Sequence, residues 1–207
     1  MLISIGVRRC PMSTYERPNP SAATGSTAVT KFCLVRHGTT DWNQQGRIQG
    51  CTDTVLNEQG RAEISRLAAE LADEGWELVV TSSLQRAEES GEIIGRILKI
   101  PVFSYQDLRE RSFGPLEGLH FTEIKAQYPA GSDQPGLPGL ESKPEIEARA
   151  LMTMTSLASV FAHRRVIIVS HGGFLRAFFR VGLSLERSAP ANAERVVVAW
   201  DGTWHLL

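Results

Sequence analysis

The sequence has 207 residues, of which 42% are hydrophobic, and this length and composition suit one globular domain with a buried core. Its 22 basic and 23 acidic side chains leave a formal charge of −1, which excludes a global field that attracts nucleic acid or an anionic membrane. No run approaches the roughly 18 to 20 apolar residues of a membrane span. Any affinity for an anion must therefore come from a local cluster of basic side chains. The composition is also compatible with a homodimer.

The cysteines and the N-terminal residues indicate the compartment and the start of the fold. Cys10, Cys33 and Cys51 form neither an even disulfide framework nor a CxxC or zinc-knuckle pattern. The first arginines come after a short apolar run, the reverse of a secretory signal, so we expect a cytoplasmic protein. Residues 1–30 are rich in Ser, Thr, Pro, Ala and Gly without a period, which predicts a disordered leader before a single domain over 31–207.

From residue 31 onward, apolar runs alternate with amphipathic helical patterns. The expected elements are a strand over 31–35, a helix over 57–75, a strand over 76–81, a helix over 84–98, a strand over 101–105, a loop over 128–139, a helix over 144–162, a strand over 164–170, a helix over 173–183 and a C-terminal hairpin with positive φ at Asp201 and Gly202. This order predicts an α/β fold, a three-layer α/β/α sandwich with a mostly parallel central sheet. We interpret the loop, rich in Pro and Gly, as a lid or rim.

Charged side chains follow four of the expected strands at the point where each strand ends. Arg36 and His37 follow the first strand, Arg86 the second, Glu110 the third and His171 the fourth. Because ligands of open α/β sheets bind beyond the carboxyl ends of the strands, we expect these side chains to meet in one crevice. Each alone has an ordinary explanation as a surface or capping residue. The functional interpretation therefore rests on the shared edge.

The mixture of histidine and arginine at this edge favours an anion. A histidine pair first suggests a transition metal, but Arg36 and Arg86 would repel a divalent cation. A phosphate dianion instead accepts hydrogen bonds from guanidinium groups and from backbone N–H groups beside glycine. No GxxxxGK[ST] or GxSxG pattern occurs, which excludes a P-loop and a nucleophile elbow. We therefore expect no metal and no cofactor, with histidine as the nucleophile toward a phosphoryl group.

Four motifs in this order resemble the histidine phosphatase superfamily, which includes the cofactor-dependent phosphoglycerate mutases. They are LVRHGTTDWNQQGRIQG (34–50), TSSLQRAEES (81–90), LRERSFGPLEG (108–118) and VSHGGFLRA (169–177). The resemblance covers about residues 31–207 and implies a phosphoglycerate mutase-like fold. Two departures, Thr39 where the family often has Glu and Leu140 where it often has Gly, remove no catalytic group.

The resemblance implies a role for each matching residue. His37 resembles the nucleophile that becomes phosphohistidine, and Glu110 resembles the proton donor to the leaving alkoxide, which later helps to activate water. The other phosphate-pocket residues are then Arg36, Arg86 and His171, and the substrate contacts are Thr40, Asn43, Gln49, Gly50 and Gly172. From the residues alone, Thr40 and Asn43 are equally explained as caps of a helical turn.

Three alternatives to this assignment remain. Glu117 is a rival acid, although it matches a common non-catalytic position of the family. A mutase would hold a second anionic group, but the interval 119–140 contains Lys125 as its only Lys or Arg, so hydrolysis of a small phosphorylated metabolite is favoured. A non-catalytic relative that binds a phosphorylated ligand would lack the nucleophile or the acid, and His37 and Glu110 are both present.

Overall fold

The computed structural model describes residues 29–207. The predicted leader over 1–30 therefore lies outside the described residues, apart from Val29 and Thr30. Thr30 already belongs to the first strand, one residue earlier than predicted. In the part that the structure describes, no helix has both the length and the apolar character needed to span a membrane.

Within residues 29–207, six strands form one sheet in the order β3-β2-β4-β1-β5-β6. They are β1 (Thr30–Arg36), β2 (Leu78–Ser82), β3 (Val102–Tyr105), β4 (Arg165–Ser170), β5 (Arg195–Trp200) and β6 (Trp204–Leu206). The first four strands pair in parallel, while β5 and β6 are antiparallel to their neighbours. Arg36 of β1 pairs with Ser170 of β4, so the residues that follow these strands start at the same level of the sheet.

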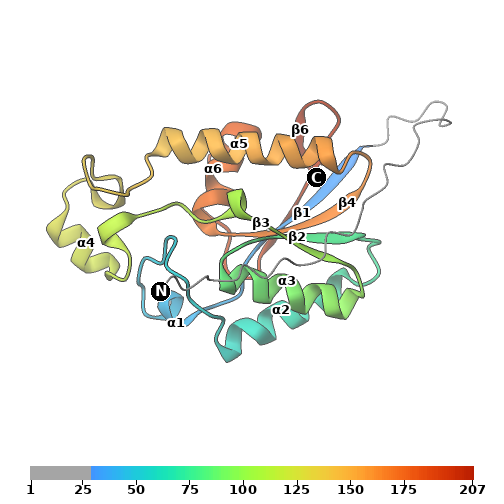
Figure 1. The fold of residues 1–207 in the computed structure, drawn as a ribbon, viewed down its shortest axis with the longest axis horizontal. Coiled ribbons are helices and arrows are strands. Elements are labelled where there is room, and N and C mark those ends of the chain that lie inside the picture. The colour runs from blue at the N-terminus through green and yellow to red at the C-terminus, as the bar shows by residue number, and fades with distance from the viewer. Residues whose placement is uncertain (1–28) are drawn as a thin grey trace, which may run out of the picture.

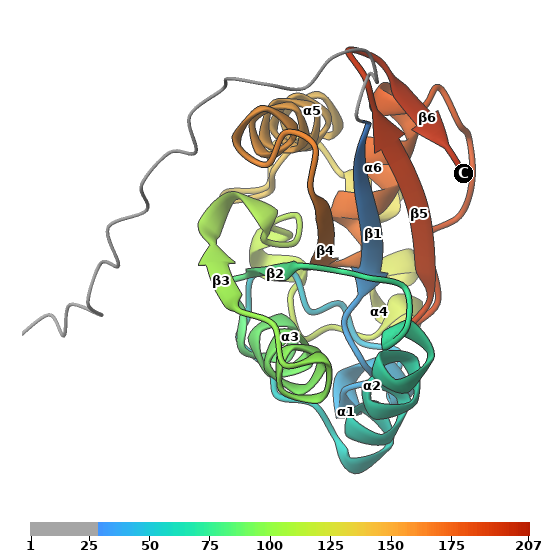
Figure 2. The same ribbon diagram turned by 90° about the vertical axis from the view of Figure 1, so that its right-hand side faces the viewer.

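Helices cover both faces of the sheet, and this confirms the predicted three-layer α/β/α architecture (Figures 1 and 2). Helices α2 (Glu58–Leu71) and α3 (Gln85–Leu98) lie on one face, and α5 (Lys143–Val160) and α6 (Gly172–Gly182) lie on the other. Capping side chains start two of them: Asn57 accepts from an N–H of α2, and Ser142 starts α5 in a capping box.

The alternation of side chains along β1 divides the core between the two faces. Phe32 and Leu34 belong to the cluster packed by α5 and α6, whereas Cys33 and Val35 belong to the cluster packed by α2 and α3. All four are 0% exposed, as expected for a strand buried on both sides. Burial fixes the register of β1, because a slip by one residue would exchange the two sets.

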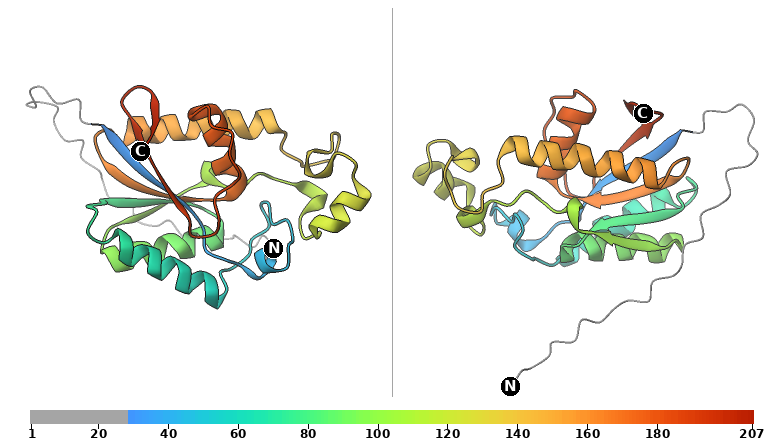
Figure 3. Two further views of the ribbon diagram at one scale, coloured as in Figure 1. Left: turned by 180° about the vertical axis from the view of Figure 1, so that it is seen from behind. Right: turned by 45° about the horizontal axis from the view of Figure 1, so that its top comes forward.

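Short elements lie beyond the carboxyl ends of the strands, outside the three layers (Figures 1 and 3). They are α1 (Asp41–Gln44), α4 (Phe121–Gln127) and two 3-10 turns at Gly114–Leu116 and Gly131–Asp133. Ile48, Leu116 and Ile124 form a small third core beneath them. A further 3-10 turn, Gln106–Leu108, packs against β2 and α5 and adds Leu108 to the core. The loop predicted over 128–139 thus contains one short turn, and α4 precedes it. The sequence analysis missed α4, which has only seven residues.

Two local predictions need correction. The helix predicted over 57–75 ends at Leu71. The hairpin turn has three residues, since Trp200 pairs with Trp204, and Gly202 takes positive φ while Asp201 does not. The Asp201 carboxylate instead accepts from Thr203 N at 3.2 Å and Thr203 Oγ1 at 3.0 Å. This side-chain bonding stabilises the turn without a left-handed residue at its first position.

Candidate active site

Two histidines meet at the carboxyl ends of the central parallel strands. His37 follows β1 and His171 follows β4, and the register of these strands brings the ring centroids to 5.1 Å. Both side chains are almost fully buried, at 2% and 0% exposure. The strand-end argument therefore correctly placed these residues together, although they are far apart in the sequence.

His37 is held in one tautomer with a free lone pair. Its Nδ1 lies 2.7 Å from the carbonyl oxygen of Gly38, and because a carbonyl only accepts, Nδ1 must carry the proton of this bond. Burial, followed by the charges of Arg86 and Arg36, holds the pKa of His37 well below its ordinary value of 6.5. The ring is thus neutral near pH 7, and its Nε2 has a lone pair available for a nucleophile.

His171 contributes a buried donor to the same site. Its Nε2 lies 2.8 Å from Ser82 Oγ, whose oxygen also accepts from Leu84 N at 3.3 Å. Burial, the charge of Arg86 and the neighbouring His37 lower the pKa of His171 well below 6.5. A neutral ring carries one proton, so a Ser82 hydroxyl that donates to Nε2 places that proton on Nδ1.

Two arginines turn part of their guanidinium groups toward backbone carbonyls. Arg86, 1% exposed, donates from Nη2 to Gly50 O at 2.7 Å and from Nη1 to Thr52 O at 2.9 Å. Arg36 donates from Nη1 to Pro190 O at 2.8 Å. These bonds fix the position of both guanidinium groups, and burial lowers the pKa of each from its ordinary value.

Three buried nitrogen atoms of this group have no hydrogen-bond partner among the described residues: Arg36 Nε, Arg86 Nε and His171 Nδ1. An orphaned buried donor is costly unless a ligand satisfies it. The two guanidinium donors, together with the His171 ring in the tautomer that carries its proton on Nδ1, match the acceptor oxygens of a phosphoryl group. Within residues 29–207 no group of three or more His, Cys, Asp or Glu side chains is arranged to hold a metal ion.

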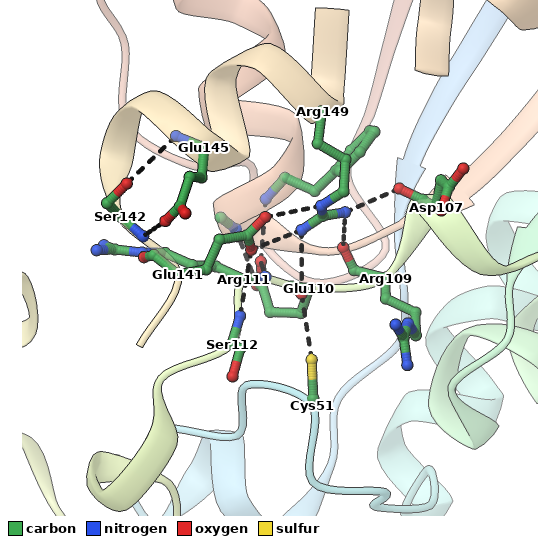
Figure 4. A network of polar contacts seen from close by, with 12 residues as sticks. Cys51, Asp107, Arg109, Glu110, Arg111, Ser112, Glu141, Ser142, Glu145 and Arg149 are labelled. Atoms are coloured by element: carbon green, nitrogen blue, oxygen red, sulfur yellow. Dashed lines mark hydrogen bonds and ion pairs between the residues drawn. The ribbon is translucent and has the colours of Figure 1, made fainter. Parts of the chain in front are cut away.

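The carboxylate of Glu110 lies at the N-terminus of α6 (Figure 4). Its Oε2 accepts from Gly173 N at 2.9 Å, and its Oε1 accepts from Phe174 N at 3.0 Å and from Arg111 N at 2.8 Å. These three N–H groups fix the orientation of the Glu110 carboxyl group. Because α6 directly follows His171, the carboxyl group is held at the same sheet edge as the histidines.

The carboxylate of Glu117, the rival acid, is bonded to donors of the surrounding loops. Its carboxylate accepts from Cys51 N at 3.0 Å, Thr52 N at 2.9 Å, Thr52 Oγ1 at 2.6 Å and Phe113 N at 3.0 Å. These bonds hold the loop whose carbonyls receive Arg86. Four donors occupy the carboxylate, so Glu117 supports the loop and has little capacity left for a transferred proton.

The sequence profile of the histidine phosphatase superfamily, branch 1, matches residues 32–203, which is most of the chain. The chain belongs to the histidine phosphatase superfamily. Among its superfamily relatives, the uncharacterized phosphatase PhoE of Bacillus subtilis is 34% identical over 149 residues, 72% of this chain and 75% of the relative. A metal-independent phosphoserine phosphatase of Arabidopsis thaliana is 37% identical over 161 residues, 73% and 68% of the two chains.

A solved structure of the superfamily shares the fold. The mycobacterial glucosyl-3-phosphoglycerate phosphatase in complex with VO3 superposes with a TM-score of 0.77 at 27% identity, covering 85% of this chain and 96% of that chain. Proteins named probable phosphoglycerate mutases also match, at 32% identity over 169 residues for one from Erwinia tasmaniensis. The predicted family and the phosphoglycerate mutase-like fold are thus confirmed.

The three predicted substrate contacts with polar side chains form hydrogen bonds with one another. Thr40 is the N-cap of α1, and Asn43 completes a reciprocal capping box with it. Thr40 Oγ1 also lies 3.0 Å from Gln49 Oε1. The capping interpretation of Thr40 and Asn43 is therefore correct, and their contact with a substrate stays a prediction.

The two predicted glycines lie where a side chain would disturb the site. A Cβ on Gly50 would meet Glu117 Oε1 at 2.1 Å, and Gly50 has φ of +56°, which favours glycine. A Cβ on Gly172 would lie 3.4 Å from Arg36 Cζ and Nε. Both glycines let the backbone approach an arginine closely, Arg86 at Gly50 and Arg36 at Gly172.

The sequence analysis missed residues that hold the site from distant segments. Asn192 Nδ2 donates to His37 O at 3.0 Å and lies 3.2 Å from Asn43 Oδ1, and no local pattern marks it. Ser90 Oγ accepts from Gly38 N at 3.2 Å and donates to Arg86 O at 2.6 Å. Ser90 lies within the quoted motif TSSLQRAEES, so a position one helical turn after Arg86 was the available signal.

Proposed function

We propose that this chain hydrolyses phosphomonoesters of small metabolites through a phosphohistidine on His37, with Glu110 as general acid and base. One observation carries the proposal: a buried, neutral His37, with its proton fixed on Nδ1, lies beside Arg36 Nε, Arg86 Nε and His171 Nδ1, three atoms that have no hydrogen-bond partner among the described residues. The relatives named phosphatases support the hydrolytic outcome. The cysteine pattern supports a cytoplasmic enzyme.

In the first step, Nε2 of His37 attacks phosphorus and the ester P–O bond breaks. The negative charge of the phosphoryl oxygens is stabilised by donors fixed in advance, from Arg36, Arg86 and His171. As Nε2 forms the P–N bond, positive charge develops on the ring. The carbonyl oxygen of Gly38 stabilises that charge through Nδ1–H. The product of this step is an alcohol and a phosphoenzyme.

Glu110 enters the first step as the protonated acid and gives this proton to the leaving oxygen, so that it ends the step as a carboxylate. Among the described residues, Oε1 of Glu110 accepts two N–H bonds and Oε2 accepts one, so the second lone pair of Oε2 is the site for the transferred proton. In the second step water attacks the phosphohistidine, the Glu110 carboxylate accepts a proton from that water, and the P–N bond breaks. Phosphate leaves, and both residues return to their starting states.

Hydrolysis is favoured over mutase action by the charges near the lid. Lys125, the one cation of the interval 119–140, is exposed on α4. Two of the cations beside that interval, Arg111 and Lys143, are paired with Asp133 of the lid at 2.7 Å and 2.8 Å. A second anionic group would have to displace this carboxylate to bind either of them. Incubation with 3-phosphoglycerate and its bisphosphate should therefore release phosphate without interconverting the monophosphate isomers.

Trapping the phosphoenzyme tests the nucleophile. Rapid mixing with a ³²P-labelled phosphomonoester and an alkaline quench should leave acid-labile label on the wild-type chain and none on His37→Ala. His171→Ala is the matched control, because it removes a neighbouring imidazole and should label slowly while keeping the nucleophile. Label on the His37→Ala protein would show that another residue accepts the phosphoryl group. Absence of label and of turnover on a panel including phosphoserine would instead favour a non-catalytic binder.

A further inference from the structure

Arg149, in the second turn of α5, donates hydrogen bonds to the backbone segment that carries the proposed proton donor, Glu110 (Figure 4). Its Nη1 donates to Asp107 O at 2.8 Å and to Arg109 O at 2.9 Å, and its Nη2 donates to Glu110 O at 3.4 Å. Its Nε and Nη2 also reach the two carboxylate oxygens of Glu141, both at 2.8 Å. All five N–H donors of the guanidinium are therefore used within the protein.

Arg149 also touches the helix end that receives the carboxylate. Its guanidinium lies over the ring of Phe174, 5.5 Å from the centroid. Phe174 N in turn donates to Glu110 Oε1 at 3.0 Å. One side chain thus contacts both supports of Glu110, the backbone before it and the first turn of α6 beside it. This geometry can fix the position of the carboxyl group relative to the sheet edge.

Glu141 anchors the arginine and joins it to the end of the lid. Besides its two bonds with Arg149, the carboxylate of Glu141 accepts from Ser112 N at 3.3 Å. Its backbone N–H donates to Ser112 O at 2.9 Å, and its carbonyl accepts from Arg111 Nε at 2.6 Å. The side chains of Arg149 and Glu141 are 24% and 17% exposed, so solvent screens this pair less than a surface ion pair.

We propose that Arg149, held by Glu141, is a positioning residue that sets the place of the Glu110 carboxyl group for proton transfer. The inference rests on the proposed role of Glu110 as proton donor. Arg149 has no donor left for substrate, in contrast to Arg36 and Arg86, whose Nε atoms have no partner among the described residues. Lysine cannot replace it, since a single ammonium does not reproduce a planar fork with five donors.

The test compares first-step transfer rates for two esters in Arg149→Lys and Glu141→Gln. A displacement of about 1 Å at a catalytic group costs roughly 10²-fold, so alkyl phosphates, whose alkoxides need a proton, should lose about that factor. Nitrophenyl phosphate, whose phenolate leaves without help, should lose less than about 3-fold. Arg180→Lys is the matched control. This arginine of α6 forms ion pairs with Glu147 and Glu186, and its variant should show no bias between the esters.

Glu110→Gln and the double variant with Arg149→Lys separate the two proposals. If Arg149 acts through Glu110, adding Arg149→Lys to Glu110→Gln should cause little further loss on alkyl phosphates. Equal losses on both esters, or full additivity in the double variant, would overturn the positioning role. No ester bias in Glu110→Gln itself would refute the proton donor, and with it this inference. If Arg149→Lys does not fold by circular dichroism, Glu141→Gln, which keeps the size of the side chain, decides the outcome.

Discussion

Replacing Gly173 by alanine tests the position of Glu110 from the opposite side. A Cβ at this position would meet Glu110 Oε1 at 2.4 Å, which is too close for a non-bonded contact, and Glu110 Cδ at 3.1 Å, which is a tight one. The carboxyl group must therefore move away from α6 and lose its bond from Gly173 N. The backbone itself tolerates alanine, because residue 173 lies within the helix.

The two consequences of Gly173→Ala differ in size. Alanine is better than glycine in a helix by about 0.8 to 1 kcal/mol, which partly offsets the loss of a hydrogen bond to a carboxylate of about 1.5 to 3 kcal/mol. The net loss in the free energy of unfolding should be about 0.5 to 2 kcal/mol. A misplaced general acid costs about 10² to 10⁴ in rate, equivalent to roughly 3 to 5 kcal/mol in the barrier. Transfer from alkyl phosphates should thus suffer more than stability.

The assay measures first-step transfer from alkyl and nitrophenyl phosphates together with urea unfolding. Gly182→Ala is the control in the same helix, since its Cβ would crowd Phe178 Cε2 at 2.5 Å, at the end of α6 away from the site. It should lower stability without a bias between the esters. A Gly173→Ala enzyme that transfers from alkyl phosphates at the wild-type rate would refute the argument that the α6 terminus places the acid.

The remaining predictions concern charge, metal and the second glutamate. The pKa values of His37 and His171 lie below 6.5, so the unfolded chain binds more protons, and stability should fall as pH drops below 6.5, by up to about 1.4 kcal/mol per pH unit for each histidine. Urea unfolding of His171→Ala between pH 5 and 7.5 should show a shallower slope, and an unchanged slope would contradict this. Activity should survive a chelator and be blocked by vanadate, which imitates five-coordinate phosphorus. Loss of activity in the chelator and its recovery on addition of one divalent ion would contradict a metal-independent site. Glu117→Ala removes the side chain that holds the loop bonded to Arg86, so vanadate should inhibit this variant less strongly, and its transfer rates from alkyl and nitrophenyl phosphates should fall equally. A much larger loss on alkyl phosphates would identify Glu117 as the acid.

Much of the fold follows from local patterns that the sequence displays. The apolar runs at β1 and β4 and the amphipathic helices between strands predict the three layers, because each pattern specifies which faces are buried. The strand-end rule then brings His37 to His171, since parallel strands in register end at one edge. The ends of elements were less predictable. At the hairpin, hydrogen bonds to the Asp201 carboxylate stabilise the turn, so Asp201 does not need the left-handed conformation that we predicted for it.

The supports of the site depend on contacts that no local pattern encodes. Asn192 bonds to a carbonyl 155 residues away, and Arg149 reaches carbonyls about 40 residues earlier in the chain. The motifs marked Glu110 because the residues around it in sequence resemble the family. They did not mark Arg149, whose partners are backbone carbonyls that any sequence supplies.

The charges around His37 explain how one arrangement can serve two stages of the proposed reaction. Before substrate binds, Arg36, Arg86 and burial keep the ring neutral, and the Nε2 lone pair is available. A bound phosphoryl dianion offsets the same two cations, so their repulsion toward positive charge on the ring weakens as the P–N bond forms. The bond from Nδ1 to Gly38 O then stabilises the charged ring. Neutralising an arginine should therefore slow transfer even where substrate still binds, because it removes stabilisation of the transition state.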